Sequence, residues 1–187
     1  MPPRADDVRV TTARLKLAGA VLALGLLLVS PAAAKDRAAP QGGHTASLEA
    51  ELLVEINEVR AEHGLRPLRA NARLATAAGA HSREMVARGF FAHASSDGTP
   101  FWRRIRHFYG DGGYGYWSVG ENLLWSSGGL TARAALDLWM ESPGHRRNIL
   151  TARWREIGVS AVNVSAAPGV FGGRDVVIVT TDFGVRS

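Results

Sequence analysis

Three residues of this sequence have side chains that often do chemistry in proteins: His93, Glu121 and His145. They stand among small or turn-forming residues, in segments where hydrophobic periodicity predicts connections. Two neutral imidazoles and a carboxylate that converge on a cleft suit a divalent metal, zinc most readily. They equally suit general acid–base catalysis, because histidine titrates near neutral pH. A third interpretation stays open, in which the three residues only anchor separate loops.

Other catalytic motifs have less support. No G-x-S-x-G occurs, because the segment 158–162 lacks the final glycine and lies in a predicted strand. A G-x-G-x-x-G is present at Gly110, Gly112 and Gly115, but no strand precedes it, so it does not predict nucleotide binding. The D-F-G triplet 182–184 stands without any other kinase element and is interpreted as a chance match.

Composition excludes several further classes of protein. The 187 residues include no cysteine, which rules out disulfides, cysteine-bound zinc and thiol catalysis. The net charge is +5, from 22 basic and 17 acidic residues, and the basic residues are scattered along the chain. This pattern indicates no nucleic-acid-binding surface.

The N-terminal segment has the pattern of a secretory signal peptide. Basic residues precede an apolar run from Leu17 to Val29, which is shorter than the roughly 20 residues of a membrane span. The small residues up to Ala34 form an A-x-A cleavage site. We therefore predict a signal peptide over 1–34, a linker over 35–46 and one domain over 47–187, secreted to the outside of the cell or the periplasm. The alternative is an uncleaved N-terminal anchor; the mature form has no predicted transmembrane span and is expected to be a monomer.

The elements of the domain follow from caps, stops and periodicity. A first helix capped by Ser47 and stopped by Gly64 is followed by a second over 72–88, in which His81 is interpreted as a packed histidine bonded to the backbone. Shorter helices are predicted over 101–108 and 131–140, the latter ended by Ser142-Pro143-Gly144. Strands are predicted over 116–124, 156–164 and 176–183, the last two as an antiparallel pair. Because helices come first and strands last, the expected fold class is α+β.

Five ordered blocks of residues are similar to a known family. The first block covers residues 57–82 and contains Asn57-x-x-Arg60, Gly64-Leu65-x-Pro67-Leu68, Asn71-x-x-Leu74 and Ala80-His81-Ser82. The second is Phe90-Phe91-x-His93 and the third is Gly120-Glu121-Asn122. The fourth is Trp139-x-x-Ser142-Pro143-Gly144-His145-Arg146-x-Asn148, and the fifth is Ile157-Gly158-Val159. The domain from residue 47 onward thereby resembles the CAP superfamily, named for cysteine-rich secretory, antigen 5 and pathogenesis-related one proteins. The absence of cysteine is typical of the bacterial branch.

The resemblance implies an α-β-α sandwich with a small antiparallel sheet and a large open cleft. Relatives place two histidines and two acidic residues in that cleft, and by motif His93, Glu121 and His145 match three of them. The second acid often lies three residues after the tryptophan, where this chain has Ser142; Glu141, one residue earlier, is the remaining candidate. Zinc or another divalent cation would then be held by His93 and His145 with Glu121.

The function expected from these residues is ligand binding. The resemblance implies a lipid-like, sterol-like or envelope ligand, bound directly or through the metal. Catalysis is not expected, because no activated nucleophile is visible. Two alternatives stay open: an extracellular hydrolase acting on peptides or cell-wall polymers through the same His/Glu cleft, and a non-catalytic interaction protein of the envelope.

Overall fold

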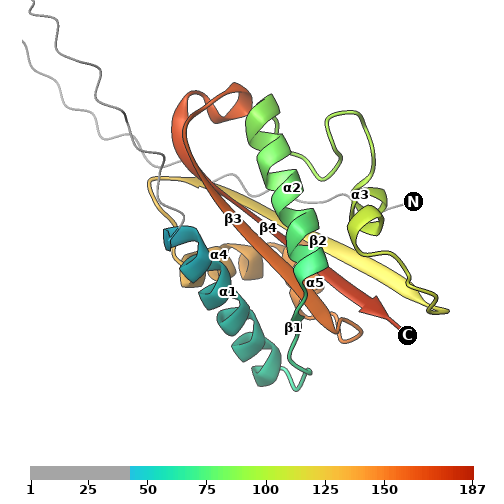
Figure 1. The fold of residues 1–187 in the computed structure, drawn as a ribbon. Helices are drawn as coiled ribbons and strands as arrows, with labels where there is room; N and C mark the ends of the chain where they lie inside the picture. The colour runs from blue at the N-terminus through green and yellow to red at the C-terminus, as the bar shows by residue number, and fades with distance from the viewer. Residues whose placement is uncertain (1–42) are drawn as a thin grey trace, which may run out of the picture.

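A four-stranded sheet forms the middle layer of the fold (Figure 1). A computed structural model describes residues 43–187; the predicted signal peptide, its cleavage site and most of the predicted linker lie outside the described residues. The strands are β1 (Arg69–Ala70), β2 (Trp117–Ser127), β3 (Glu156–Ala167) and β4 (Arg174–Arg186), in the order β1-β3-β4-β2. The long strands pair antiparallel, as predicted for the last two, whereas the short β1 pairs parallel to β3.

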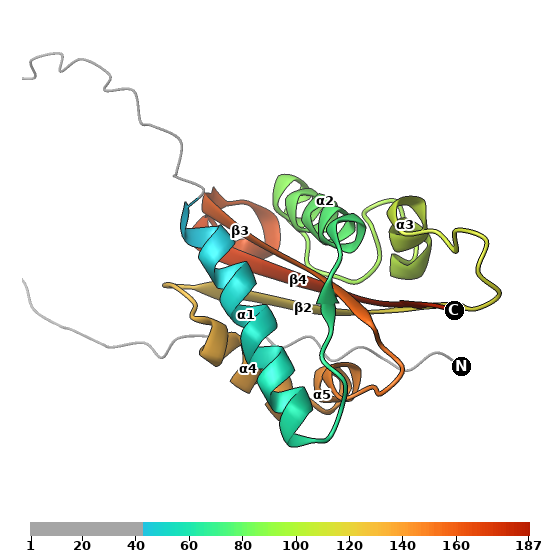
Figure 2. The ribbon, with the colours of Figure 1, turned by 60° about the horizontal axis from the view of Figure 1, so that its bottom comes forward.

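Helices cover both faces of this sheet (Figure 2). On one face lie α2 (Ala72–Arg88) and α3 (Phe101–Phe108). On the other face lie α1 (Gly43–Glu62), α4 (Ala132–Glu141) and α5 (Pro143–Ile149). The expected α+β class and the three-layer sandwich are confirmed. Among the described residues, no helix is both long enough and apolar enough to cross a membrane.

The two faces of the sheet have different cores. Because side chains alternate along a strand, consecutive residues of β2 or β4 face opposite helical layers. On the α1 side, one continuous apolar cluster joins α1 and α4 to the strands and includes the buried Trp139, Trp154 and Phe183. On the α2 side there are two separate apolar clusters, one around Met85 and Trp125 and one with the side chains Leu74, Ala77, Ile105 and Tyr109.

Local sequence explains where α2 begins and ends. The Asn71 side chain accepts hydrogen bonds from the backbone N–H groups of Arg73 and Leu74, which otherwise have no partner in a first helical turn. Gly89 adopts the left-handed conformation, φ 66°, that commonly follows a helix. The helices predicted over 72–88 and 101–108 are confirmed residue for residue.

Three predicted boundaries are wrong. The segment 142–150, predicted as a connection, contains α5, because Pro143 occupies the first helical turn, where its missing N–H costs nothing. The strand predicted over 116–124 continues to Ser127 and contains Glu121. The first helix begins at Gly43 rather than Ser47, so residues 43–46 of the predicted linker are helical.

Two polar residues of the first sequence block have structural roles. Asn57 exchanges two hydrogen bonds with the backbone of Leu68, at 2.7 and 3.0 Å, and so fixes the connector between α1 and α2. The buried guanidinium of Arg60 donates to the carbonyl oxygens of Ile149 and Thr151 at the end of α5. The first helix is thereby tied to the helix that carries His145.

Candidate functional site

A band of buried polar residues separates the two apolar clusters on the α2 side of the sheet. Glu121 of β2 lies opposite Asp182 of β4, and Thr180 of β4 is hydrogen-bonded at 2.8 Å to Ser82 of α2. With His81, these residues are at most 3 % exposed. Polar groups so completely buried need partners, so their contacts define what the site can do.

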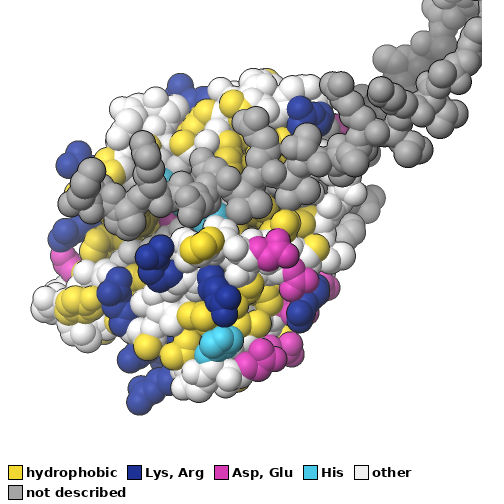
Figure 3. Space-filling view, turned by 180° about the vertical axis from the view of Figure 1, so that it is seen from behind, with side chains coloured by type: hydrophobic (Ala, Val, Ile, Leu, Met, Phe, Trp, Pro, Cys, Tyr) yellow, Lys and Arg dark blue, Asp and Glu magenta, His cyan; other side chains and the backbone are white. Residues whose placement is uncertain are grey.

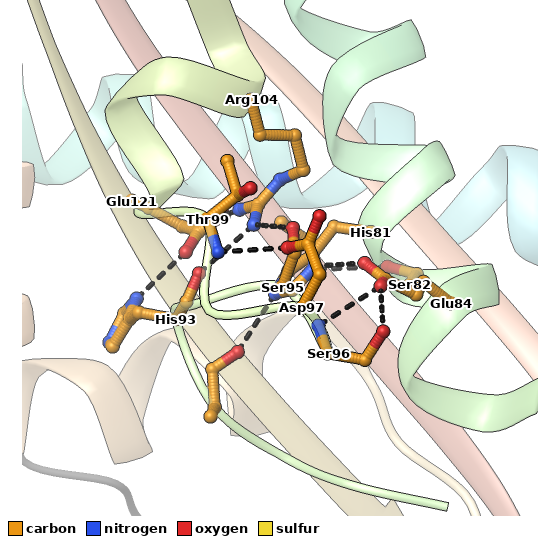
Figure 4. Close-up of polar contacts among 12 residues, drawn as sticks. His81, Ser82, Glu84, His93, Ser95, Ser96, Asp97, Thr99, Arg104 and Glu121 are labelled. Atoms are coloured by element: carbon orange, nitrogen blue, oxygen red, sulfur yellow. Dashed lines mark hydrogen bonds and ion pairs between the residues drawn. The ribbon is translucent and has the colours of Figure 1, made fainter. Parts of the chain in front are cut away.

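Two cationic or hydrogen-bonding groups hold the Glu121 carboxylate (Figure 4). Nδ1 of His93 lies 2.8 Å from Oε1, and the guanidinium of Arg104, from α3, forms an ion pair with Oε2. Burial opposes ionisation here, but the bond to His93 and the charge of Arg104 outweigh it and hold the pKa of Glu121 below its usual value. The carboxylate is therefore charged, and His93 donates its Nδ1 proton to it.

The pKa of Asp182 is shifted in the opposite direction to that of Glu121. Burial, and next the charge of Glu121, raise its pKa well above the usual value, although Arg104 lowers it. Apart from Glu121, with which a neutral Asp182 can share its proton, no residue of 43–187 bonds either carboxyl oxygen of Asp182. The two neighbouring carboxyl groups thus differ in proton affinity, and Asp182 favours its neutral form.

The loop that carries His93 is held at several points. It leaves α2 at Gly89, whose carbonyl accepts from Val170 N–H at 2.9 Å. A Cβ built on Gly169 would lie 2.0 Å from that same Gly89 oxygen, so this contact with the β3–β4 connection requires glycine. Further along, Nε2 of His81 bonds the Ala92 carbonyl at 2.8 Å, and Arg104 bonds the carbonyl of His93 at 3.0 Å. The packed, backbone-bonded role predicted for His81 is confirmed.

One nitrogen of this network, Nε2 of His93, makes no hydrogen bond within the described residues. The imidazole of His93 is 18 % exposed, and its Nε2 has no hydrogen-bond partner in the described part of the chain. Because Nδ1 carries the proton that Glu121 accepts, Nε2 is an acceptor. Nε2 itself is buried, so the site contains one oriented nitrogen whose capacity to accept a hydrogen bond is unused within the described residues.

The helix that carries His145, α5, is hydrogen-bonded to β2 at Glu121 and Asn122, through Asn148 and the backbone of His145. Asn148 donates to the Glu121 carbonyl at 3.0 Å and to the Asn122 side chain at 2.9 Å, and Asn122 donates to the carbonyl of His145. The imidazole of His145 is buried, with its centroid 6.4 Å from the ring of Trp139. Its predicted place in one cleft with His93 and Glu121 stays a prediction.

Two neighbouring residues, Glu141 and Ser142, are the candidates for the second acidic position of the predicted cleft. Glu141 is the last residue of α4 and is exposed, whereas the following residue, Ser142, is only 6 % exposed. The Ser142 hydroxyl has no hydrogen-bond partner among residues 43–187. Of the two, Ser142 is therefore the residue that faces the interior.

The donor set around Glu121 does not fit a divalent cation. Both carboxylate oxygens are engaged, and the Arg104 guanidinium already supplies positive charge there. Within residues 43–187, no three histidine, aspartate or glutamate side chains are grouped so that they could hold a metal. Zinc sites need three or four such ligands. We therefore derive no step through a metal.

Sequence reasoning missed Arg104 and Asp182. Arg104 precedes Ile105 on an amphipathic helix, where arginine normally indicates the solvent side, yet its side chain is only 8 % exposed. Asp182 belongs to the triplet that the sequence pattern assigns to chance. The available signal was an acidic residue inside a predicted strand rich in valine and isoleucine, because a buried carboxyl group needs a specific environment.

Comparison with known proteins identifies the family of this domain. The model of the Cysteine-rich secretory protein family (CAP) matches residues 53–180. The chain is 36 % identical over 107 residues to the uncharacterized protein YkwD of Bacillus subtilis, covering 57 % of this chain and 39 % of that protein. It is 28 % identical over 111 residues to the uncharacterized membrane protein YlbC of the same organism, covering 59 % and 30 %. The chain thus spans well under half the length of either relative.

Solved structures have the same fold. An extracellular protein containing a SCP domain from Bacillus anthracis aligns with a TM-score of 0.58 and 24 % identity, over 80 % of this chain and 45 % of that one. A cysteine-rich secretory protein from Staphylococcus aureus aligns with a TM-score of 0.56 and 19 % identity, over 77 % and 40 %. An outer surface protein of Borrelia burgdorferi aligns with a TM-score of 0.55 and 19 % identity, over 74 % and 92 %.

Proposed function

This chain belongs to the cysteine-rich secretory protein (CAP) family, and from its site we propose that it is an extracellular binding module whose ligand donates a hydrogen bond to His93. The observation that carries the proposal is the oriented Nε2 of His93, which has no partner among the described residues. An extracellular location is supported by the B. anthracis and B. burgdorferi proteins, which are described as extracellular and outer-surface proteins.

The electrostatics of the site favour binding over catalysis. Arg104 balances the charge of the Glu121 carboxylate, and the hydrogen bond that this carboxylate accepts from Nδ1 holds the ring of His93 in a fixed position, as a binding site requires. A ligand with a hydroxyl or amide N–H, such as a sterol or a cell-wall muropeptide, supplies the donor that Nε2 requires. Burying that donor against an acceptor that is already fixed adds specificity at little cost in entropy.

Thermal unfolding of the full chain tests the proposal with two probes, cholesterol sulfate and muramyl dipeptide. A ligand that binds only the folded state raises the melting temperature. We expect one probe to raise it in the wild type and in His107→Ala, whose imidazole is exposed on α3, but not in His93→Ala. If neither probe acts, or if the shift persists in His93→Ala, the proposed binding mode is wrong.

The alternative of an extracellular hydrolase rests on the same pair of side chains. A carboxylate that accepts the Nδ1 proton of a histidine holds the ring so that Nε2 can act as a general base toward water. Glu121→Gln keeps the size of the side chain and removes its charge. If the protein hydrolyses casein or purified peptidoglycan, Glu121→Gln is expected to reduce that rate by 10²-fold or more, on the order of a general base's contribution. An unchanged rate would exclude this mechanism.

Chelation separates direct binding from binding through a metal. The geometry around Glu121 favours a ligand that contacts His93 directly. We therefore expect the probe-induced rise in melting temperature to be the same before and after dialysis against EDTA. A rise that disappears with EDTA and returns with zinc would instead support the metal-mediated interpretation.

A further inference from the structure

The exposed side of α3 consists of aromatic and basic residues. Trp102, Arg103, Arg106 and His107 are exposed, and their spacing places them on one stripe of the helix. The opposite side carries the fully buried Ile105. Trp102 is 41 % exposed, and the guanidinium of Arg103 lies 5.4 Å from the centre of its ring. The stripe contains no acidic residue.

A second aromatic segment lies beside this helix, in the glycine-rich loop 110–116. Tyr114 and Tyr116 are 55 % and 46 % exposed. An ion pair between Arg106 and Asp111 ties the loop to α3, and Arg186 at the end of β4 bonds the carbonyl of Gly110. Arg186 also lies 5.7 Å from the centre of the Tyr114 ring. The loop, α3 and the end of β4 therefore form one surface, visible at the end of the sheet near the C-terminus (Figure 1).

We name this surface the aromatic–arginine face and define it by the following residues: Trp102, Arg103, Arg106, His107, Tyr114, Tyr116 and Arg186. Five large hydrophobic side chains are exposed within residues 43–187, and three of them belong to this face. Its acidic neighbours Asp111 and Glu156 are paired with Arg106 and Arg186. Arg103 has no ion pair in the described part of the chain, so the face carries surplus positive charge.

Several exposed acidic residues lie on the opposite side of the sheet from α3. Exposed acidic residues follow α1 and α4: Glu51, Glu58, Glu62, Asp137 and Glu141. Seen from behind, most of the acidic side chains in view gather on the side away from α3, whereas basic and hydrophobic side chains are spread over the face (Figure 3). Exposed arginines also lie on α2 and α5, among them Arg88, Arg146 and Arg147. What distinguishes the aromatic–arginine face is that its arginines stand beside exposed aromatic rings.

We propose that the aromatic–arginine face docks on the surface of an anionic lipid bilayer. Trp and Tyr rings favour the headgroup level of a membrane, where one edge is apolar and the other is hydrated. Arginines beside them are attracted by anionic headgroups. The face is an outer helix stripe and an exposed loop, a shape that suits a bilayer surface better than a polymer held in a groove. Docking of this kind is peripheral and needs no membrane-spanning helix.

Tryptophan fluorescence gives a readout specific to this face. All five tryptophans lie within residues 102–154, and of these Trp102 is the most exposed. The full chain is mixed with vesicles of phosphatidylcholine alone, or with 30 % phosphatidylglycerol, each also prepared with a brominated acyl chain as quencher. We expect quenching only with the anionic vesicles, weakened by salt, and largely absent in Trp102→Phe. Equal quenching on neutral vesicles, or no quenching on anionic ones, overturns the proposal.

Charge variants separate docking from general attraction. Arg103→Glu and Arg133→Glu change the net charge equally, but Arg133 lies on α4, 68 % exposed, among the acidic residues. At about fivefold in affinity per unit charge, Arg103→Glu, which changes the charge by two units, is expected to lower vesicle affinity about 25-fold, and Arg133→Glu much less. Equal losses, or tight binding to a soluble sugar-phosphate polymer without any vesicle binding, would contradict docking on lipid.

Discussion

The two faces of the sheet bury their side chains in different ways. Against α1, α4 and α5 the core is one continuous apolar cluster, and buried polar residues on this side, among them Arg60, Asn122 and His145, lie at α5. Against α2 and α3 the apolar residues are split, and Glu121, Asp182 and Arg104 lie between the two parts. Apolar packing stabilises by area and tolerates adjustment, whereas buried charges stabilise only when every partner is in place. The α1 side therefore supplies stability, and the α2 side holds a site at the expense of stability.

The largest expected effect comes from breaking the ion pair on the α2 side. Arg104→Ala leaves Glu121 charged and buried without its main cationic partner. We expect the free energy of unfolding in urea to fall by about 3–5 kcal/mol. The neighbouring exposed Arg103→Ala is the control and should change it by no more than about 0.5 kcal/mol.

Replacing both partners makes the α2 side resemble the α1 side. The double variant Arg104→Met/Glu121→Leu removes both charges and should recover most of the loss caused by Arg104→Ala. If the double variant is as unstable as Arg104→Ala, the loss arises from packing of the Arg104 stem, and the contrast between the faces is weaker than described.

The next effect concerns the contact that seats α2 on the sheet. A Cβ on Gly158 would lie 2.0 Å from the Ala75 nitrogen, which belongs to backbone and cannot move aside. Gly158→Ala should therefore cost about 3 kcal/mol, the upper end for overpacking. Gly115→Ala, where no atom lies within 4 Å of the added Cβ, is the matched control, measured by thermal unfolding. Similar melting temperatures for both variants would show that α2 shifts without cost.

A smaller effect depends on pH. The pKa of Asp182 is raised by burial and by Glu121, so the folded state holds this proton more tightly than the unfolded chain. As pH rises above the usual range of aspartate, the unfolded chain releases its proton first, and stability falls until the raised pKa is passed. Asp182→Asn cannot titrate and should gain stability relative to the wild type as pH increases from 4 to 7. Parallel pH profiles of unfolding would contradict the assignment.

The smallest effects compare one helix cap on each face. Thr131 caps α4 through a single bond to Ala134 N–H, and its change to Ala should cost about 1 kcal/mol. Asn71 caps α2 through two N–H groups and also bonds Glu156, so Asn71→Ala should cost more, about 2 kcal/mol. Urea unfolding of both variants tests the order, and a reversed order would mean that the bond to Glu156 contributes nothing.

Features set by neighbouring residues could be predicted from the sequence. The helix over 72–88 follows from Asn71, Gly89 and the apolar stripe between them, all of which act locally. In contrast, Pro143-Gly144 is compatible with both a stop and a start, and only the packing of α5 on β2 decides for a helix. The two-residue β1 likewise exists because β3 lies beside it.

Side-chain type alone singled out His93 and Glu121, because a buried imidazole needs a polar partner. The structure bonds the two side chains at 2.8 Å, and the role of this pair in a functional site stays a prediction. Arg104 and Asp182 depend on which face of a helix or strand is buried beneath a particular neighbour. This depends on the tertiary structure. The sequence pattern around Arg104 is also that of an ordinary solvent-facing arginine, so it does not reveal the buried ion pair.

The contact between Gly89 and Gly169 has a consequence for how this family member can diversify. The turn between β3 and β4 and the start of the His93 loop share one point where two backbones touch. An insertion in that turn would displace the loop, even though the two segments are about 80 residues apart in sequence. Variation in the hairpin is therefore expected to change the position of His93, although neither segment shows this coupling when it is considered alone.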